Sequence, residues 1–329
     1  MDRQLATTAV LDPFTSVFES VVSNISTVVR GKEGAIGLAL VCLLAEGHLL
    51  IEDVPGVGKT TLAKALARSF DLECRRIQFT PDLLPSDITG VSLYNRDGMS
   101  FTFRPGPVFA NVVIADEINR ASPKTQSALL EAMQERQVSL DDVTRPLPDP
   151  FMVVATQNPI EYEGTYPLPE SQIDRFLMRL SLGYPDKDSE AAMLDAARAM
   201  DPLEVAKLPV VADNATIRAM FRIVKSIYSA SFVRSYIVEL AVATRRHPAV
   251  RLGMSPRSTL GMQRAAQALA ASLGRAYVTP DDVKAVLRPV VEHRLVLDPS
   301  LAASGTEVRE ILDEIERAVP VPAGRDIER

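Results

Sequence analysis

Residues 48–61, HLLIEDVPGVGKTT, constrain the fold of this chain more than any other stretch. The apolar run 48–51 predicts a short buried strand, and a helical pattern begins at Lys59. Between them, Gly56 and Gly58 allow successive backbone N–H groups to point into one concave turn. A strand, a glycine loop and a helix in this order predict a cradle for phosphate groups at the amino terminus of the helix. The alternative is a glycine loop that binds nothing.

The loop and the first helical turn supply the expected nucleotide contacts, namely Pro55, Gly56, Val57, Gly58, Lys59, Thr60 and Thr61. Lys59 would reach the β- and γ-phosphates as a point charge, and the Thr60 hydroxyl would bind Mg²⁺. One residue departs from the usual motif, because Asp53 stands where the motif begins with glycine. That glycine eases the turn without binding phosphate, so here the end of the strand must turn in another way.

Composition limits the class of protein. The 329 residues suffice for two domains, and 47% apolar with 24% charged residues is ordinary for a soluble globular chain. A net charge of -6 argues against nucleic acid as an obligate partner. The most apolar run, residues 34–45, is shorter than the roughly 20 residues that span a bilayer, and no signal peptide is visible. We therefore expect a cytoplasmic protein without membrane insertion, with Cys42 and Cys74 as free thiols.

Five short apolar runs, separated by helical patterns or long connections, favour a doubly wound parallel sheet. They are residues 48–51, 74–79, 111–115, 151–155 and 176–182. Functional groups are then expected at the carboxyl ends of the strands. Alternating residues around polar turns also predict two β-hairpins, at 91–103 and 137–148, which are more often contact devices than core.

The remaining pattern is helical. Two helices are predicted before the first strand, at 13–29 and 33–46, and from residue 186 onward only helices are expected. Those are residues 188–200, 213–228, 233–246, 256–273, 280–297 and 307–318. Ser255 with Pro256, and Thr279 with Pro280, are strong signals of helix starts. The chain is accordingly divided into an α/β domain, 1–185, and a helical domain, 186–329.

Two further strand ends carry chemistry. The run 111–115 is followed by Asp116 and Glu117, about fifty residues after the glycine loop. Asp116 would hold Mg²⁺ beside Thr60, and Glu117 would orient and deprotonate an attacking water. After the next strand, Asn158 could sense the γ-phosphate, although an Asn-Pro pair can also simply start a turn.

The glycine loop, the two acids and Asn158, in this order along the chain, resemble the motifs of the AAA+ ATPases, and more closely those of the MoxR family. The resemblance covers about residues 14–300 and is densest in EDVPGVGKT (52–60), ADEINRASPKTQSALLEAMQE (115–135), ATQNP (155–159), LPESQIDRFLMRL (168–180) and GMSPR (253–257). It implies an αβα nucleotide domain with a five-stranded parallel sheet, followed by a helical lid. It also implies two hairpin insertions, at the places where hairpins are predicted. Asp53 looks usual for this family.

The resemblance assigns roles to single residues. Asn158 is similar to sensor 1 and Arg257 to sensor 2, while Gly31 lies in a loop that contacts adenine in such proteins. In the first turn of a capped helix, the Arg257 fork could bind phosphate oxygens, or it could merely pair with a surface acid. Arg175 matches the arginine finger that a neighbouring subunit supplies. Its rivals are Arg179 and Arg120, and a local pair of Asp174 with Arg175 is the structural alternative.

What the resemblance implies for function is an ATPase that binds ATP and Mg²⁺ between sheet and lid and works as a ring, expected to be a hexamer. The expected work is chaperone-like maturation or assembly of protein complexes, often with a von Willebrand factor A domain partner. One alternative is a nucleic-acid motor, which the acidic balance disfavours. A nucleotide-gated scaffold without turnover is another. A P-loop kinase or GTPase fits less well, because no guanine-reading motif is visible.

Overall fold

Five parallel strands form the central sheet, in the order β2-β5-β8-β1-β9. The computed structural model describes residues 8–96, 99–159, 164–191 and 204–321. The strands are β1 (Leu49–Glu52), β2 (Cys74–Gln78), β5 (Val112–Asp116), β8 (Met152–Gln157) and β9 (Met178–Leu180). Because every pairing is parallel, the strands all end at one edge, here called the carboxyl edge, and begin at the amino edge. The predicted five-stranded parallel sheet is confirmed.

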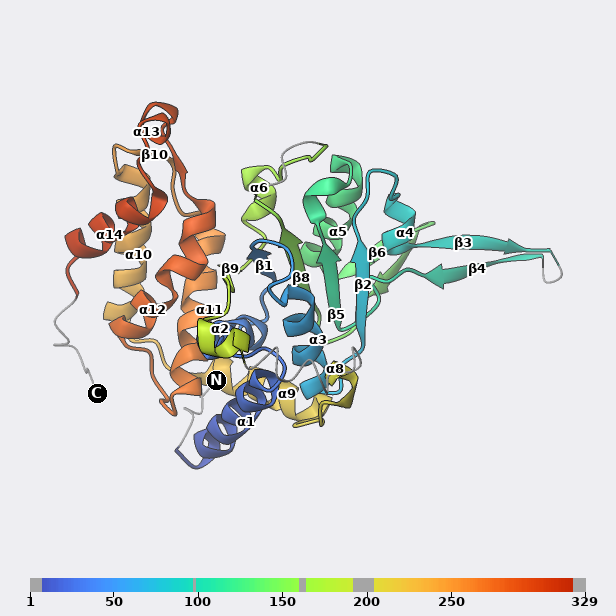
Figure 1. Cartoon of the computed structure of the whole chain (residues 1–329), viewed down its shortest axis with the longest axis horizontal. Coiled ribbons are helices and arrows are strands. Elements are labelled where there is room, and N and C mark those ends of the chain that lie inside the picture. The colour runs from blue at the N-terminus through green and yellow to red at the C-terminus, as the bar shows by residue number, and fades with distance from the viewer. Residues whose placement is uncertain (1–7, 97–98, 160–163, 192–203, 322–329) are drawn as a thin grey trace.

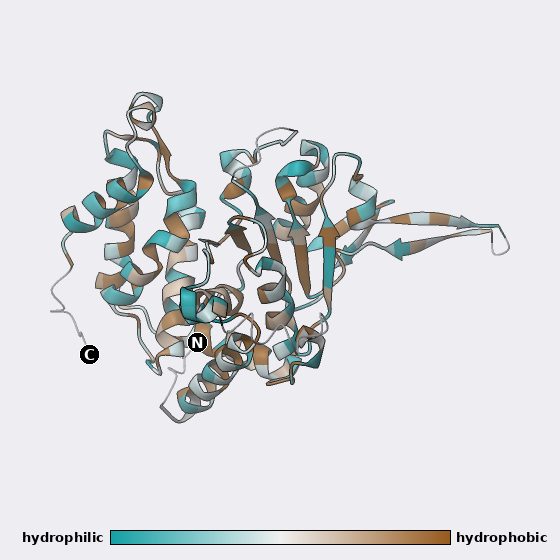
Figure 2. Cartoon of the chain, in the orientation of Figure 1, coloured by the Kyte–Doolittle hydropathy of each residue, from teal (hydrophilic) through white to brown (hydrophobic). Residues whose placement is uncertain are grey.

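Successive strand residues point to opposite faces of the sheet, as the two-residue period requires. In β1, Leu49 and Ile51 belong to one apolar core and Leu50 to the other. The first core includes residues of α1 (Thr8–Ser26), α2 (Glu33–Leu44) and α3 (Lys59–Ser69), and the second those of α4 (Pro85–Thr89) and α5 (Pro123–Glu135). Figure 2 shows the central strands as strongly apolar. The sheet is therefore covered by helices on both faces.

The carboxyl-terminal part is a lid of helices that packs beside the sheet (Figure 1). Its elements are α10 (Ser231–Arg246), α11 (Pro256–Ser272), α12 (Pro280–Val291), η2 (Glu292–Arg294), α13 (Pro299–Ala303) and α14 (Val308–Ala318). The helices before them, α8 (Glu204–Lys207) and α9 (Asn214–Ser226), lie nearer α3 and α1. The predicted starts at Pro256 and Pro280 are confirmed, since Ser255 and Thr279 cap these helices. Within the described residues, no helix is both long and apolar enough to serve as a membrane span.

The lid is helical, but the expectation that only helices follow residue 186 is wrong. The helix predicted at 280–297 ends at Val291, and β11 (Val296–Leu297) pairs antiparallel with β10 (Val250–Leu252). Strands this short show no alternation of apolar and polar residues. Because Leu295 continues the apolar spacing of α12, the sequence pattern after Val291 still predicts a helix. Most of the helix predicted at 188–200 lies outside the described residues.

Both predicted hairpins are present. β3 (Gly90–Asn95) pairs with β4 (Ser100–Pro105), and this hairpin projects far from the body in Figure 1. β6 (Gln137–Leu140) pairs with β7 (Val143–Pro146), and the positive φ angles of Asp141 and Asp142 are those of a tight hairpin turn. The Ser92 hydroxyl donates to the Asp141 carboxylate, so the two hairpins touch.

Candidate functional site

The glycine loop joins β1 to α3 at the carboxyl edge, as the sequence predicts. Gly56 and Gly58 have φ angles of 86° and 93°, a left-handed conformation that favours glycine. Gly58 is also the amino-terminal cap of α3, and no described side chain caps this helix. The positive end of the helix dipole is therefore presented to the loop, where an anion is stabilised.

Lys59 crosses the ends of two neighbouring strands. Its ammonium donates to the carbonyl oxygens of Asp53 at 2.6 Å and Gln157 at 3.3 Å. Asp53 follows β1 and Gln157 ends β8, which is the strand beside β1. Lys59 thus already holds a position above the carboxyl edge in which its charge can face phosphate.

Asp53 explains how the end of the strand turns without the usual glycine. Its Oδ2 accepts hydrogen bonds from the backbone N–H groups of Leu182 and Gly183, both at 2.6 Å, and from the Ser181 hydroxyl at 2.9 Å. Its Oδ1 accepts the N–H of Val54 at 2.9 Å. Burial alone would raise the pKa of Asp53, but these hydrogen bonds outweigh it and the pKa is lowered. The carboxylate therefore fastens the loop to the segment after β9.

Asp116 ends β5 and Glu117 follows it, and Thr156 of β8 joins the two acids. The Thr156 hydroxyl donates to Asp116 Oδ1 at 2.5 Å and accepts the backbone N–H of Glu117 at 2.9 Å. Asp116 Oδ2 accepts Arg76 Nε at 2.9 Å. The expected ligands of Mg²⁺ are the Thr60 hydroxyl and the Asp116 carboxylate. Both are oxygen ligands, which Mg²⁺ prefers, and phosphate and water would fill the rest of its coordination shell. The described residues contain no group of three or more His, Cys, Asp or Glu that could hold a metal alone.

Glu117 occupies a left-handed backbone conformation, with φ of 56°, which is uncommon for a residue with a side chain. Its Oε2 accepts hydrogen bonds from Gln78 Nε2 at 2.9 Å and Arg120 Nη1 at 3.0 Å. The side chain remains 31% exposed. A partly exposed carboxylate, aimed by a strained backbone at the end of a strand, is placed to take a proton from a water molecule.

The structure brings the predicted nucleotide residues to one edge. Asp116 ends β5, buried Asn158 directly follows β8, and the loop after β1 leads to Lys59, so the three residues lie at the ends of adjacent strands. The individual roles of these residues stay predictions.

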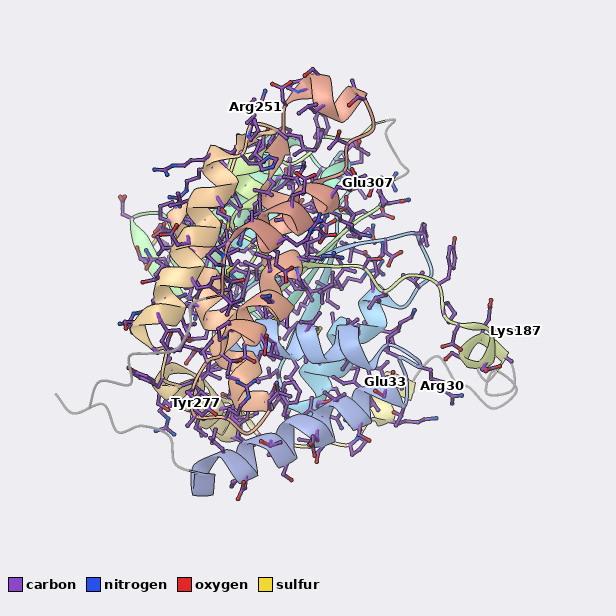
Figure 3. All side chains as sticks on the ribbon, turned by 90° about the vertical axis from the view of Figure 1, so that its left-hand side faces the viewer. Arg30, Glu33, Lys187, Arg251, Tyr277 and Glu307 are labelled. Carbon is purple, nitrogen blue, oxygen red and sulfur yellow. The ribbon has the colours of Figure 1, made fainter. Side chains whose placement is uncertain are left out.

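The loop before α2 lies on the same side. The backbone turns at Gly31, with φ of 67°, and a Cβ added there would lie 2.4 Å from the Ser189 Oγ. Lys32 Nζ donates to the carbonyl of Tyr184 at 2.7 Å. In Figure 3, Arg30 and Glu33 lie at the same end of the molecule as Lys187. Because this segment follows β9, Gly31 reaches the carboxyl edge, and its contact with adenine stays a prediction.

Arg175 and Arg257 lie elsewhere. Both line a cavity of about 460 Å³ together with Gly47 and His48, the residues just before β1. This amino-edge cavity is therefore on the side opposite the glycine loop. Because α11 presents Arg257 to the amino edge, Arg257 lies away from the glycine loop of its own chain. That ATP binds between the sheet and the lid stays a prediction.

The amino-edge cavity is strongly basic. Its lining has two acids and five arginines, the acids being Glu46 and Asp174 and the arginines Arg136, Arg175, Arg257, Arg264 and Arg294. Burial and the nearby charge of Arg257 lower the pKa of Arg175. The buried Nε of Arg175 has no hydrogen-bond partner among the described residues. A guanidinium whose buried Nε lacks a partner, and which lies near the like charge of Arg257, is suited to bind an anion from outside the chain.

The rival arginines are engaged within the chain. Arg179 bonds Glu52 at 2.6 Å and Glu292 at 2.9 Å, which ties β9 to β1 and to the lid. Arg120 bonds Glu117 at the carboxyl edge. The Asp174 carboxylate bonds the lid, and among the described contacts it makes no pair with Arg175.

Sequence reasoning missed three side chains of the carboxyl edge: Thr156, Arg76 and Gln78. Thr156 stands inside the ATQNP segment, one residue beyond the predicted strand 151–155, and the sequence gives it no role. Arg76 and Gln78 alternate along β2, the edge strand next to β5, and reach Asp116 and Glu117. Polar alternation on a strand beside two functional acids is a signal that could have identified them.

Comparisons with known proteins agree with the fold. Residues 48–178 match the family described as "ATPase family associated with various cellular activities (AAA)", and residues 242–315 match the AAA lid domain. The chain is 49% identical to the uncharacterized protein YeaC of Bacillus subtilis, over 94% of this chain and 96% of that protein. It is 39% identical to Chaperone MoxR1 of Mycobacterium tuberculosis, over 92% and 82%. A solved structure of a candidate ATPase from Cytophaga hutchinsonii has a TM-score of 0.89 at 37% identity, covering 96% and 98% of the two chains. The chain belongs to the MoxR family of AAA+ ATPases.

Proposed function

We propose that this protein hydrolyses ATP at the carboxyl edge of its sheet. The observation that carries the proposal is the convergence of the glycine loop, Lys59, the linked acids Asp116 and Glu117, and Asn158 on adjacent strand ends. Thr60 and Asp116 would hold Mg²⁺, which when bound neutralises charge on the phosphate oxygens. Asp116 would then exchange Arg76 for the ion.

Each protein group has a defined task. Lys59 would turn from the carbonyls of Asp53 and Gln157 to the β- and γ-phosphates. Glu117 would release Gln78 and Arg120, orient the attacking water and take its proton. Asn158 would contact the γ-phosphate from the end of β8, and the loop at Gly31 would contact adenine.

Arg175 and Arg257 would complete the site of a neighbouring copy. They lie at the amino edge, so they can touch a triphosphate only when it is bound by the glycine loop of another chain. The same head-to-tail contact, repeated, closes into a ring, and we propose six copies by family resemblance. In related phosphoryl transfers an arginine supplied by a partner raises the rate roughly 10³- to 10⁵-fold.

The work done by hydrolysis is proposed to be chaperone-like. A relative is named Chaperone MoxR1, and the β3–β4 hairpin exposes Leu93, Tyr94 and Phe101, apolar side chains that could contact a client. The client would be a protein complex in maturation or assembly, with a von Willebrand factor A domain protein as the expected partner. The two free cysteines fit work in the reducing cytoplasm.

A mixing experiment tests the chemistry and the geometry together. Arg175→Ala subunits keep an intact Glu117, and Glu117→Gln subunits keep an intact Arg175. Each variant alone should hydrolyse ATP slowly, and a mixture should regain activity, with a maximum near equal amounts. No regain at any ratio would show that Arg175 does not act across an interface. Equal rates for wild type and Glu117→Gln would contradict hydrolysis and favour the nucleotide-gated scaffold.

A further inference from the structure

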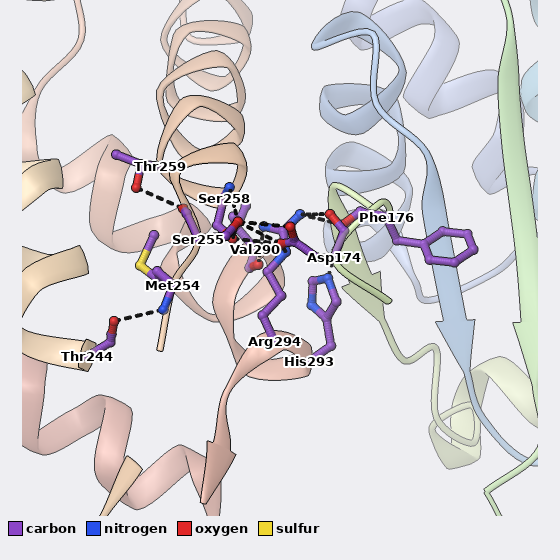
Figure 4. Close-up of polar contacts among 10 residues, drawn as sticks. All are labelled: Asp174, Phe176, Thr244, Met254, Ser255, Ser258, Thr259, Val290, His293 and Arg294. Atoms are coloured by element: carbon purple, nitrogen blue, oxygen red, sulfur yellow. Dashed lines mark hydrogen bonds and ion pairs between the residues drawn. The ribbon is translucent and has the colours of Figure 1, made fainter. Parts of the chain in front are cut away.

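Asp174 joins the two segments that carry Arg175 and Arg257, which are two of the five arginines that line the amino-edge cavity. It directly precedes Arg175, and its carboxylate accepts hydrogen bonds from the hydroxyls of Ser255 and Ser258, both at 2.9 Å (Figure 4). These two serines flank Arg257 in the first turn of α11. A single carboxylate therefore connects the backbone that carries Arg175 with the helix that carries Arg257.

The contact is part of the cap of α11. Ser255 is the capping residue, and its Oγ accepts the backbone N–H of Ser258 at 3.1 Å. Its hydroxyl proton is then used for Asp174. A carboxylate at this end of the helix also interacts favourably with the helix dipole. Further along α11, a Cβ added at Gly261 would lie 2.8 Å from Leu177 Cδ1, so helix and strand entry are in close contact.

Arg294 closes the arrangement from the other side. It is only 6% exposed, and its guanidinium donates to the carbonyls of Val290 at 2.7 Å and Phe176 at 2.5 Å. Its Nε lies 3.2 Å from Asp174 Oδ1, but its N–H is not directed at an acceptor, so this contact is an ion pair and not a hydrogen bond. Burial lowers the pKa of Arg294 to about 10, and Asp174 opposes the shift, so Arg294 stays charged near neutral pH.

We propose that Asp174 and Arg294 are positioning residues, which hold Arg175 and Arg257 in one arrangement so that both reach the triphosphate of a neighbouring copy together. Asp174, Ser255, Ser258 and Arg294 are called the Asp174 network. The inference rests on the proposed function. Its physical basis is that Arg175 belongs to the α/β half and Arg257 to the lid, so their spacing depends on whatever joins the halves. Misplacing a catalytic group by about 1 Å can cost roughly 100-fold in rate.

The test compares one substitution in two places. In the mixture described above, Glu117→Gln subunits contribute only arginines and Arg175→Ala subunits contribute only the nucleotide site. Asp174→Asn is added first to the Glu117→Gln subunit and then, in a separate mixture, to the Arg175→Ala subunit. The first placement should lower the regained kcat roughly tenfold or more, with an unchanged KM for ATP, whereas the second should leave kcat unchanged.

Controls separate positioning from folding. The cost of Asp174→Asn to subunit stability is the same in both placements, so a merely structural role would lower both mixtures equally, and that result overturns the inference. Ser258→Ala, which removes one donor but keeps the ion pair, should give the same asymmetry with about a fivefold loss. Asp313→Asn breaks the exposed pair with Arg288 on the lid and should leave both mixtures unchanged.

The experiment distinguishes a failure of the proposed function from a failure of the inference about Asp174. If the parent mixture regains no activity, action across the interface is wrong and the inference falls with it. If the parent mixture is active but indifferent to where Asp174→Asn is placed, the inference alone is wrong.

Discussion

The two edges of the central sheet differ in how they are built. At the carboxyl edge the functional groups sit in continuous sequence motifs, and Lys59, Asp116 and Glu117 all have bonding partners within the chain. At the amino edge the arginines come from separate halves of the molecule, and the Nε of Arg175 lacks a partner among the described residues. In the function that we propose, the first edge binds the ligand of its own chain. The second, which tertiary packing organises, contacts a ligand that a neighbouring copy binds.

The largest expected effect separates binding from turnover. Lys59→Ala should lower ATP affinity roughly 100- to 1000-fold, or about 3–4 kcal/mol, because a charge-assisted contact to phosphate is lost. The matched variant Arg257→Ala, at the other edge, should leave the ATP affinity of the isolated subunit within about threefold. Calorimetric titration of dilute protein measures both. Equal losses of affinity would mean that the two edges serve one site within a chain.

A smaller effect is expected from Asp53, which organises the carboxyl edge. Asp53→Ala leaves the N–H groups of Val54, Leu182 and Gly183 without their acceptor, so the free energy of unfolding should fall by about 3 kcal/mol. Asp53→Asn keeps one oxygen and should lose less. Asp53→Gly restores the usual motif, and urea unfolding that found it as stable as wild type would refute the fastening role.

The smallest effect concerns pH and distinguishes the edges again. His48, at the amino edge, is buried with its Nδ1 accepting the N–H of Val153 at 3.0 Å, so its Nε2 donates to the carbonyl of Met133. Burial lowers the pKa of His48 from 6.5 to about 4. As the pH falls below 6.5, His48 binds a proton in the unfolded chain but not in the folded chain. The free energy of unfolding therefore declines until about pH 4. Between pH 7 and 5 the loss that His48 alone causes should be about 2 kcal/mol.

The carboxyl edge should respond at lower pH. The pKa of Asp53 is lowered below 3.8, so its contribution is complete above that value and is lost only in stronger acid. Urea unfolding at pH 7 and 5 checks the order. His48→Gln should be less stable than wild type but have a shallower dependence on pH, with buried His293, whose pKa is also lowered, supplying the remainder. An unchanged dependence on pH would contradict the assignment to His48.

The sequence predicted the carboxyl edge well because its information is local. The glycine loop and the two acids after β5 are contiguous motifs, and the five strands are apolar runs whose parallel order follows from the intervening helices. Even there, the role of Asp53 could not be predicted, because its partners Ser181, Leu182 and Gly183 lie far along the chain.

The amino edge was less predictable for the same reason. Arg175 and Arg257 were each predicted from the sequence to contact phosphate, which stays a prediction, but their shared cavity depends on how α11 packs against the start of β9. The bonds from Ser255 and Ser258 to Asp174 follow from that packing and leave no spacing signal in the chain. The β10–β11 ladder was missed because its strands are too short to show a period.

Glu117 and Arg175 lie at opposite edges of the sheet, and this placement has a consequence for how activity depends on protein concentration. In the ring that we propose, each copy supplies Arg175 and Arg257 to a neighbour and Glu117 to its own nucleotide, so a solitary copy lacks the arginines that the reaction needs. In this arrangement the ATPase rate per subunit rises with the protein concentration, and dilution alone lowers it. The concentration at which subunits assemble then sets when the ATPase becomes active, before any client binds.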